Sequence, residues 1–144
     1  MMLRDEAATR AVGQWLGSQI RPGDVIALSG PLGVGKTALA RALIRSLGHS
    51  GEVPSPSFAI VQPYEELNPP VWHVDLFRIE DAGEIEELGL DSAGDAVLLV
   101  EWPERTADDS WRDALRLTLE FDHGGSRRLT ALVPPAWQER WPPE

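Results

Sequence analysis

The stretch Gly30-Pro31-Leu32-Gly33-Val34-Gly35-Lys36-Thr37 decides how this sequence is interpreted. It fits GxxxxGK[ST], the pattern of loops that bind nucleotide phosphates, at every specified position. Glycines let backbone N–H groups approach phosphate oxygens, and the next helix adds partial positive charge at its N-terminus. In that chemistry Lys36 contacts the β- and γ-phosphates and acts in catalysis, while Thr37 offers its hydroxyl to Mg²⁺. The residues expected around the phosphates are Gly30, Gly33, Val34, Gly35, Lys36, Thr37 and Ala38.

The residues on either side of this loop have the pattern that a phosphate-binding loop needs. An apolar run of strand length, 25–28, precedes it, and leucines recur every four residues after it until Gly48 supplies a helix stop. The alternative is a glycine-rich turn with a solvated lysine. Lys36 is the only lysine in the chain, and the other residues counted as Lys or Arg are all arginine. This bias toward arginine suggests that lysine is specifically required at position 36. Context and composition both favour the phosphate-binding interpretation.

Hydrophobic periodicity predicts the rest of the fold. Amphipathic spacing indicates a helix over residues 5–20, and a short acidic helix is expected over 81–90. The other expected strands are 58–61, 71–76, 96–100, 115–121 and 129–133. Strands separated by helices or long crossovers imply parallel pairing, and the last two strands flank a turn typical of a hairpin. We therefore predict an α/β, P-loop NTPase-like three-layer fold with a mainly parallel sheet and a C-terminal antiparallel hairpin, one domain over 1–144.

Two carboxylates come at the ends of predicted buried strands. The strand 71–76 carries Asp75 near its end, and 96–100 is followed by Glu101. Carboxyl ends of parallel strands meet at one edge of a sheet, so either residue could supply the second Mg²⁺ ligand that a phosphate loop needs. The alternative is that one of them caps a loop or pairs with an arginine. His73, inside a strand, is expected to be a packed core histidine.

Charge and composition exclude several classes of function. The net charge is −10, and residues 75–113 hold 13 of the 23 acidic residues but three of the 13 basic ones. This segment would repel a phosphate backbone, which argues against direct binding of DNA or RNA. The absence of cysteine excludes thiol chemistry and cysteine-ligated zinc. With no apolar run long enough for a membrane span and no secretory pattern, the sequence predicts a soluble, cytoplasmic protein.

The nucleotide and the reaction remain open to several interpretations. Guanine readers of the NKxD type need a lysine, and the only lysine is committed to phosphate, so ATP is favoured over GTP. The first hypothesis is an ATPase that drives a step in a protein assembly. A small metabolite or nucleoside kinase is the second. Such kinases generally need a lid that carries arginine, but the residues between Thr37 and Asp75 are rich in proline and contain no arginine after Arg45. A nucleotide-binding interaction module with negligible turnover is the third.

Four motifs stand in order along the chain: GPLGVGKT at 30–37, SPSF at 55–58, HVDLFR at 73–78 and VEWPE at 100–104. This order closely resembles the bacterial TsaE family. Its members are small ATPases of the pathway that installs threonylcarbamoyl on an adenosine of certain tRNAs. The resemblance covers about residues 5–105 and does not draw on the predicted hairpin or the C-terminal tail.

The resemblance implies roles for individual residues. Its second motif is similar to the family's first switch loop, which would bring Ser57 to the nucleotide. Asp75 looks like the family's aspartate beside Mg²⁺, and Glu101 resembles its catalytic or metal-linked glutamate, with Trp102 next to it. Thr9 matches an N-terminal threonine near the nucleotide, a threonine on the helix surface being the alternative.

Three positions depart from the family's pattern. The sequence has Pro31 where the family usually has aspartate, Ser57 where it has threonine and Phe77 where it has tyrosine. Ser57 keeps a hydroxyl group, whereas Phe77 has lost one. No role of that tyrosine hydroxyl can therefore be carried over to this chain.

The resemblance also implies a partner, a TsaB–TsaD complex that handles tRNA, so that this chain meets tRNA only indirectly. No membrane and no DNA partner is expected. Phosphoryl transfer is often accelerated by an arginine at the γ-phosphate, and none of Arg41, Arg45, Arg78 and Arg105 is an obvious candidate from its place in the sequence. We therefore expect slow Mg²⁺-dependent ATP hydrolysis alone and stimulation by the partner.

Overall fold

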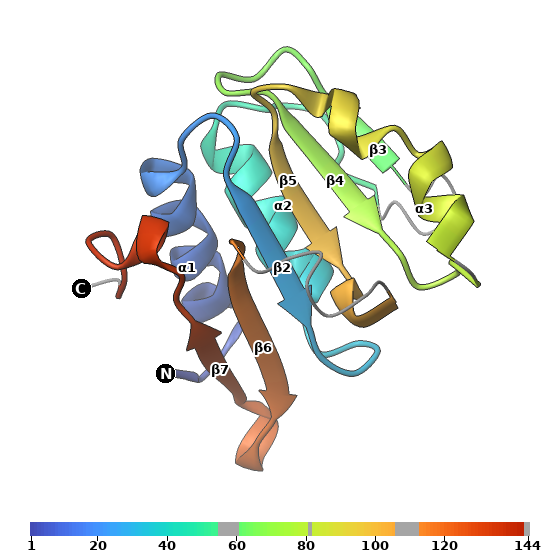
Figure 1. Cartoon of the computed structure of the whole chain (residues 1–144). Coiled ribbons are helices and arrows are strands. Elements are labelled where there is room, and N and C mark those ends of the chain that lie inside the picture. Colours follow the sequence, from blue (N-terminus) through green and yellow to red (C-terminus); the bar gives the residue numbers. More distant parts are fainter. Residues whose placement is uncertain (55–60, 81, 106–112, 143–144) are drawn as a thin grey trace.

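The computed structural model describes residues 1–54, 61–80, 82–105 and 113–142 (Figure 1). Its strands are β1 (Met2–Leu3), β2 (Val25–Ser29), β3 (Val61–Tyr64), β4 (Val71–Asp75), β5 (Val97–Glu101), β6 (Leu115–Phe121) and β7 (Arg127–Leu132). Its α-helices are α1 (Glu6–Gln19), α2 (Lys36–Ser46) and α3 (Ala82–Glu87). Within this part of the chain, none of the helices has the length and apolar character that a membrane crossing requires.

The described strands form one seven-stranded sheet in the order β1-β7-β6-β2-β5-β4-β3. The four central strands, β6, β2, β5 and β4, run parallel to one another. Antiparallel pairs add β7 and β1 at one edge and β3 at the other. The predicted α/β class, with a parallel centre and a C-terminal hairpin, is confirmed.

Some edge elements differ from the prediction. The two-residue strand β1 is too short to leave a pattern in the sequence. Of the strand expected at 58–61, residues 58–60 lie outside the described residues, and β3 runs from Val61 to Tyr64 through Pro63. Proline lacks an N–H group and is tolerated because β3 is the outermost strand. The acidic helix expected over 81–90 is shorter, ending at Glu87 before a 3₁₀ turn, η1 (Leu90–Ala93).

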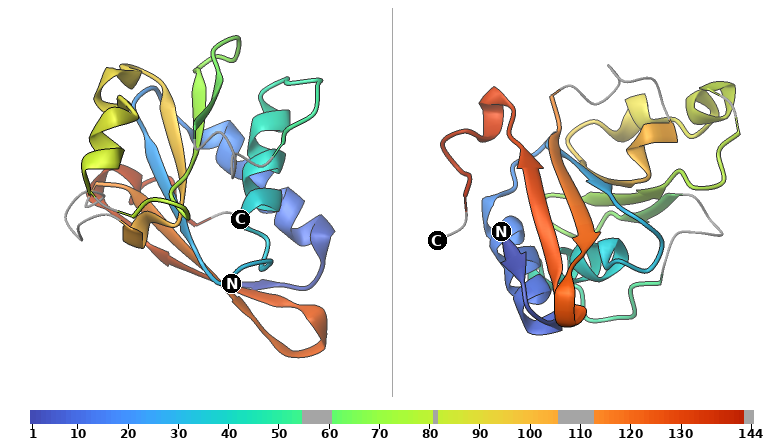
Figure 2. Two further views of the ribbon diagram at one scale, coloured as in Figure 1. Left: turned by 90° about the vertical axis from the view of Figure 1, so that its right-hand side faces the viewer. Right: turned by 90° about the horizontal axis from the view of Figure 1, so that it is seen from below.

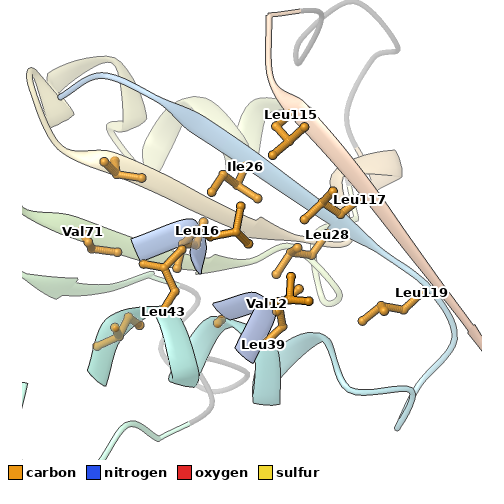
Figure 3. Packing of buried hydrophobic residues seen from close by; sticks show 14 of the residues in the cluster. Val12, Leu16, Ile26, Leu28, Leu39, Leu43, Val71, Leu115, Leu117 and Leu119 are labelled. Carbon is orange, nitrogen blue, oxygen red and sulfur yellow. The ribbon is translucent and has the colours of Figure 1, made fainter. Parts of the chain in front are cut away.

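Helices cover both faces of the sheet, as the left view of Figure 2 shows: α1 and α2 lie on one side and α3 on the other. Side chains of β4 and β5 alternate between the two faces, with Val71 and Leu99 in the core beneath α1 and α2 and Val74 and Val100 in a smaller cluster on the opposite face. The main core includes leucines of both helices and of β6 (Figure 3). A Cβ at Gly13 would lie 2.5 Å from that of Ala42, so glycine permits the close approach of α1 to α2.

The C-terminal tail contacts the segment that leads from α1 into β2. It contains the 3₁₀ turn η5 (Pro135–Trp137), and Trp137 is fully buried. Arg140 is also buried, and both of its terminal nitrogens donate to the carboxylate of Asp24, at 2.7 and 3.2 Å. Asp24 directly precedes β2, whereas the phosphate-binding motif follows β2. The tail and the motif therefore lie at opposite ends of the same strand.

Candidate functional site

The glycine-rich loop connects β2 to α2, in the position that the motif requires. Gly35 has a φ of 117° and is the N-cap of α2, so a residue with a side chain would be strained there. A Cβ at Gly30 would lie 2.5 Å from the carbonyl oxygen of Leu119 on β6. Gly30 also has a φ of 146°, so the backbone conformation favours glycine at both positions, and at Gly30 the close contact with the neighbouring strand favours it as well.

Lys36 begins α2 and is buried against the loop. Its Nζ donates to the backbone carbonyls of Gly30 and Pro31, and it lies 4.0 Å from the ring centroid of Trp102. Burial lowers the pKa of Lys36, while the charges of Glu101, Glu104 and Asp75 act in the opposite direction. The cation is thus held by neutral groups, close to carboxylates that favour its charged form.

Trp102 covers the ammonium group because the backbone turns sharply at the end of β5. Its φ of 62° makes it the one non-glycine residue of the described chain in the left-handed region. Its N–H donates to the carbonyl of Leu28 at 3.2 Å, and its ring lies 4.8 Å from that of Phe77. A conformation that is strained for a bulky residue commonly marks a functional site, since surrounding contacts must maintain it.

The two predicted carboxylates lie side by side. Asp75 of β4 pairs in register with Glu101 of the parallel strand β5, and both are buried. The hydroxyl of Thr37 on α2 donates to Glu101, with Oγ1 3.0 Å from Oε1 and 3.2 Å from Oε2. Residues from the loop's helix and from two strands therefore meet at one place.

The surroundings of Asp75 disfavour its negative charge. Burial raises its pKa, and the charge of Glu101 adds to this, although the N–H of Phe77, 2.9 Å from Oδ1, opposes the shift. Two adjacent carboxylates and a hydroxyl are the hard oxygen donors that Mg²⁺ prefers. No group of three histidine or acidic side chains within the described ranges could hold a metal unaided. A magnesium ion at Thr37, Asp75 and Glu101 therefore fits best if phosphate oxygens complete its coordination.

His73 also belongs to the site, which the sequence did not reveal. It is buried inside β4 as expected, but its Nε2 lies 2.6 Å from Oε2 of Glu101. The available signal was its spacing: it stands two residues before Asp75, and alternate residues of a strand share a face.

A cavity of about 340 Å³ lies at this site and is lined by Lys36, Thr37, Asp75, Glu101 and Trp102. Arg78 also lines this cavity. Its position after the predicted strand 71–76 did not lead us to expect it there.

A second cavity, of about 610 Å³, adjoins the same loop. The two cavities share Gly33, Gly35 and Ala38, and Thr9 and Arg127 line the larger one. Thr9 thus lies beside the loop from α1. Ser57 and the rest of the 55–58 motif lie outside the described residues.

A parallel sheet in which strand, glycine loop and helix precede two adjacent carboxylates defines the P-loop class of nucleotide-binding folds. A family model described as "Threonylcarbamoyl adenosine biosynthesis protein TsaE" matches residues 3–129. The chain belongs to the TsaE family, whose members act in the biosynthesis of threonylcarbamoyladenosine in tRNA.

Individual relatives agree with this assignment. The chain is 42% identical over 115 residues to the tRNA threonylcarbamoyladenosine biosynthesis protein TsaE of Streptomyces coelicolor, covering 77% of this chain and 78% of that one. It is 34% identical to the protein of that name from Bacillus subtilis, covering 85% and 77%. The crystal structure of Bacillus subtilis YdiB has the same fold, with a TM-score of 0.78 and 24% identity, covering 96% and 87%.

The family match extends the sequence resemblance. The motifs alone covered residues up to about 105, whereas the matched region ends at residue 129. It therefore includes β6 and the first half of β7. The matched region thus includes the hairpin turn with Gly125 and Arg127, which line the larger cavity.

Proposed function

We propose that this protein binds ATP with Mg²⁺ and hydrolyses it in the biosynthesis of threonylcarbamoyladenosine in tRNA. The observation that carries the proposal is the convergence of Lys36, Thr37, Asp75 and Glu101 on one cavity at the carboxyl end of the parallel strands. A buried lysine, a hydroxyl and paired carboxylates at a glycine-rich loop match the needs of a triphosphate and its metal ion.

The two cavities divide the nucleotide between them. The triphosphate would lie along the backbone of 33–38 toward the smaller cavity. The larger cavity is lined in part by the same loop residues and has room for the ribose and the base. The Thr9 hydroxyl and the Arg127 guanidinium would then provide polar contacts beside them. The lack of an NKxD reader favours adenine.

The residues have distinct tasks in hydrolysis. Lys36 would exchange the carbonyls of Gly30 and Pro31 for phosphate oxygens and neutralise charge that develops during transfer. Thr37 and the two carboxylates would hold Mg²⁺, which would offset the charge of the phosphates. Glu101, fixed by Thr37, would orient the attacking water.

We further propose that a TsaB–TsaD complex stimulates this hydrolysis and handles the tRNA. The acidic character of the chain supports that division, because nucleic acid is better bound by a partner. The contacts within the site support a slow rate for the isolated chain. Lys36 is engaged by loop carbonyls and Glu101 by Thr37, so these groups must exchange partners before transfer.

The test measures phosphate release at saturating Mg·ATP while the partner complex is titrated in. We expect slow turnover alone and a marked increase with the complex, both lost in Lys36→Ala. An Arg78→Ala variant separates an arginine supplied by this chain from one supplied by the partner. Full-speed turnover alone, or no response to a complex shown to bind, would contradict partner stimulation. The absence of ATP binding would contradict the whole proposal.

A further inference from the structure

His73 is a fully buried imidazole that the proposed hydrolysis does not by itself use. It lies on the face of β4 that Val71 and Asp75 share, toward the main core. Its register partner on β5 is Leu99, and one pair, Val74 with Val100, lies between this pair and the pair of Asp75 with Glu101. On that face Glu101 is therefore its diagonal neighbour across the two strands, a distance that long side chains bridge.

Glu101 is held from two directions. Nε2 of His73 lies 2.6 Å from Oε2, and both side chains are almost completely buried. The Thr37 hydroxyl approaches from α2 and is closer to Oε1, at 3.0 Å. A glutamate has three rotatable bonds, so one contact would leave the carboxylate free to turn. Two donors on different elements fix both its position and its plane.

The position of the imidazole proton follows from burial. Nδ1 of His73 has no hydrogen-bond partner among the described residues and no contact with solvent. An N–H at this position would be a buried donor without an acceptor, which is costly. The proton therefore belongs on Nε2, where it is donated to Glu101.

Packing alone does not account for this residue. Val71 on the same face and Leu99 on the next strand are apolar, and a leucine would fill similar space without a buried polar nitrogen lacking a partner. The imidazole offers the carboxylate a donor that no aliphatic side chain could supply.

We propose that His73 is a positioning residue that holds Oε2 of Glu101, so that Oε1 stays directed at Thr37 and at the cation these residues would share. The inference deepens the proposed function and rests on it. Its consequence is that the affinity for Mg²⁺ in the presence of nucleotide, and the turnover number, depend on a donor at position 73.

The experiment compares His73→Leu, which removes the donor, with His73→Gln, which retains an N–H at similar reach. In the full chain, the readouts are the Mg²⁺ concentration that gives half of the ATP-induced thermal shift, and kcat and KM for ATP. We expect His73→Leu to raise the Mg²⁺ midpoint about 10-fold and lower kcat about 10- to 100-fold, with KM changed less than about 2-fold. His73→Gln should recover most of both. His123→Leu, on the exposed hairpin turn, is the matched control and should behave as the wild type.

A double variant that combines His73→Leu with Glu101→Gln separates positioning of Glu101 from a purely structural effect. In Glu101→Gln, His73→Leu should cause no further change of the Mg²⁺ midpoint, because there is no carboxylate left to position. An additive change there, or a failure of His73→Gln to recover the midpoint, would overturn the inference. If His73→Leu does not fold, His73→Asn replaces it, since its shorter amide falls short of Oε2. A folded Asn variant with the wild-type midpoint would also overturn the inference.

The thermal shift of the wild type with Mg·ATP distinguishes a failure of this inference from a failure of the proposed function. No ATP-induced thermal shift in the wild type would overturn the proposed function itself. A normal Mg·ATP response in both the wild type and His73→Leu would overturn only the role of His73.

Discussion

The molecule buries ionic groups at both ends of β2, and the two sites are built differently. At the amino end, Arg140 donates to both oxygens of Asp24 and to the carbonyls of Gln19 and Ala136, and its guanidinium lies 3.7 Å from the ring centroid of Trp137. One cation there meets one carboxylate. At the carboxyl end, two carboxylates lie in register beside a lysine that donates to neutral carbonyls.

The difference teaches how to tell a structural ion pair from a functional site. The Arg140 site satisfies its charges internally and has no remaining demand for a ligand. The other end carries an excess of negative charge and a lysine whose contacts can be exchanged. Burial raises the pKa of Asp75 there, and the charge of Glu101 adds to the shift. Such an arrangement costs stability until a cation and phosphates complete it. Each prediction below changes one side of this comparison.

The largest effect is expected from Glu101→Gln. The amide keeps the shape of the side chain but removes the charge that orients water, so turnover should fall by about 10² to 10⁴-fold. ATP binding should be retained, because Lys36 and the loop backbone hold the phosphates. Phosphate release and an ATP-induced thermal shift, measured on the same sample, check both parts. If turnover survives and the Mg²⁺ dependence is lost, the roles of Glu101 and Asp75 are exchanged.

Arg140→Ala tests the structural end. Removing one partner leaves Asp24 largely buried without its cation, and breaking a buried pair costs about 3 to 5 kcal/mol of unfolding free energy. Urea denaturation measures the loss. Arg128→Ala is the matched control, because its ion pair with Asp122, at 3.4 Å, is largely exposed on the Arg128 side, and exposed pairs contribute about 0 to 1 kcal/mol.

Arg140→Ala also tests whether the sites at the two ends of β2 are independent. The ATP-induced increase in thermal stability should be unchanged in folded Arg140→Ala, since the pair lies far from the loop. A selective loss of that response would show that the comparison drawn here is wrong.

Lys36→Ala is expected to weaken ATP binding by about 1.5 to 3 kcal/mol, the range for a hydrogen bond to a charged group. Calorimetry with Mg·ATP measures this directly. The ligand-free variant should remain folded, because the lysine contacts carbonyls that water can also satisfy. An unchanged ATP affinity in a folded variant would contradict the phosphate-loop assignment.

The sequence revealed the functional end far better than the structural end. The loop, its helix and both carboxylates follow from short local patterns: eight consecutive residues, and acidic residues at or just after two buried strand ends. Their convergence then follows from parallel pairing alone. The sequence therefore predicted the parallel centre of the sheet, the hairpin and the meeting of Lys36, Thr37, Asp75 and Glu101 at one place.

What the sequence did not reveal depends on tertiary register. Asp24 and Arg140 are separated by 116 positions, and the contact of Arg127 with the carbonyl of Val34 spans 93. No local pattern specifies such partners. His73 is buried in its strand as predicted, but its contact with Glu101 was not foreseen, because it depends on a diagonal neighbour on the adjacent strand.

The smallest predicted effect is a gain of stability. Asp75→Asn should stabilise the ligand-free protein at neutral pH by about 1 kcal/mol, the ordinary scale of a single substitution. The pKa of Asp75 is raised in the folded state, chiefly by burial, so folded protein holds a proton at pH values where the unfolded chain has lost it. Stability contributed by this group therefore falls as the pH rises through that window, and asparagine avoids the cost.

The pH dependence separates this explanation from a general effect of the substitution. Urea denaturation of both proteins without Mg²⁺ should show the advantage of Asp75→Asn at neutral pH, and its decline as acid protonates Asp75. Asp122→Asn is the control of opposite sign, because the N–H of His123 lowers the pKa of Asp122, and its neutral variant should lose stability at neutral pH. Equal stability of wild type and Asp75→Asn at neutral pH would mean that the carboxylates impose no cost before a ligand binds, and the contrast between the two ends of β2 would then rest on geometry alone.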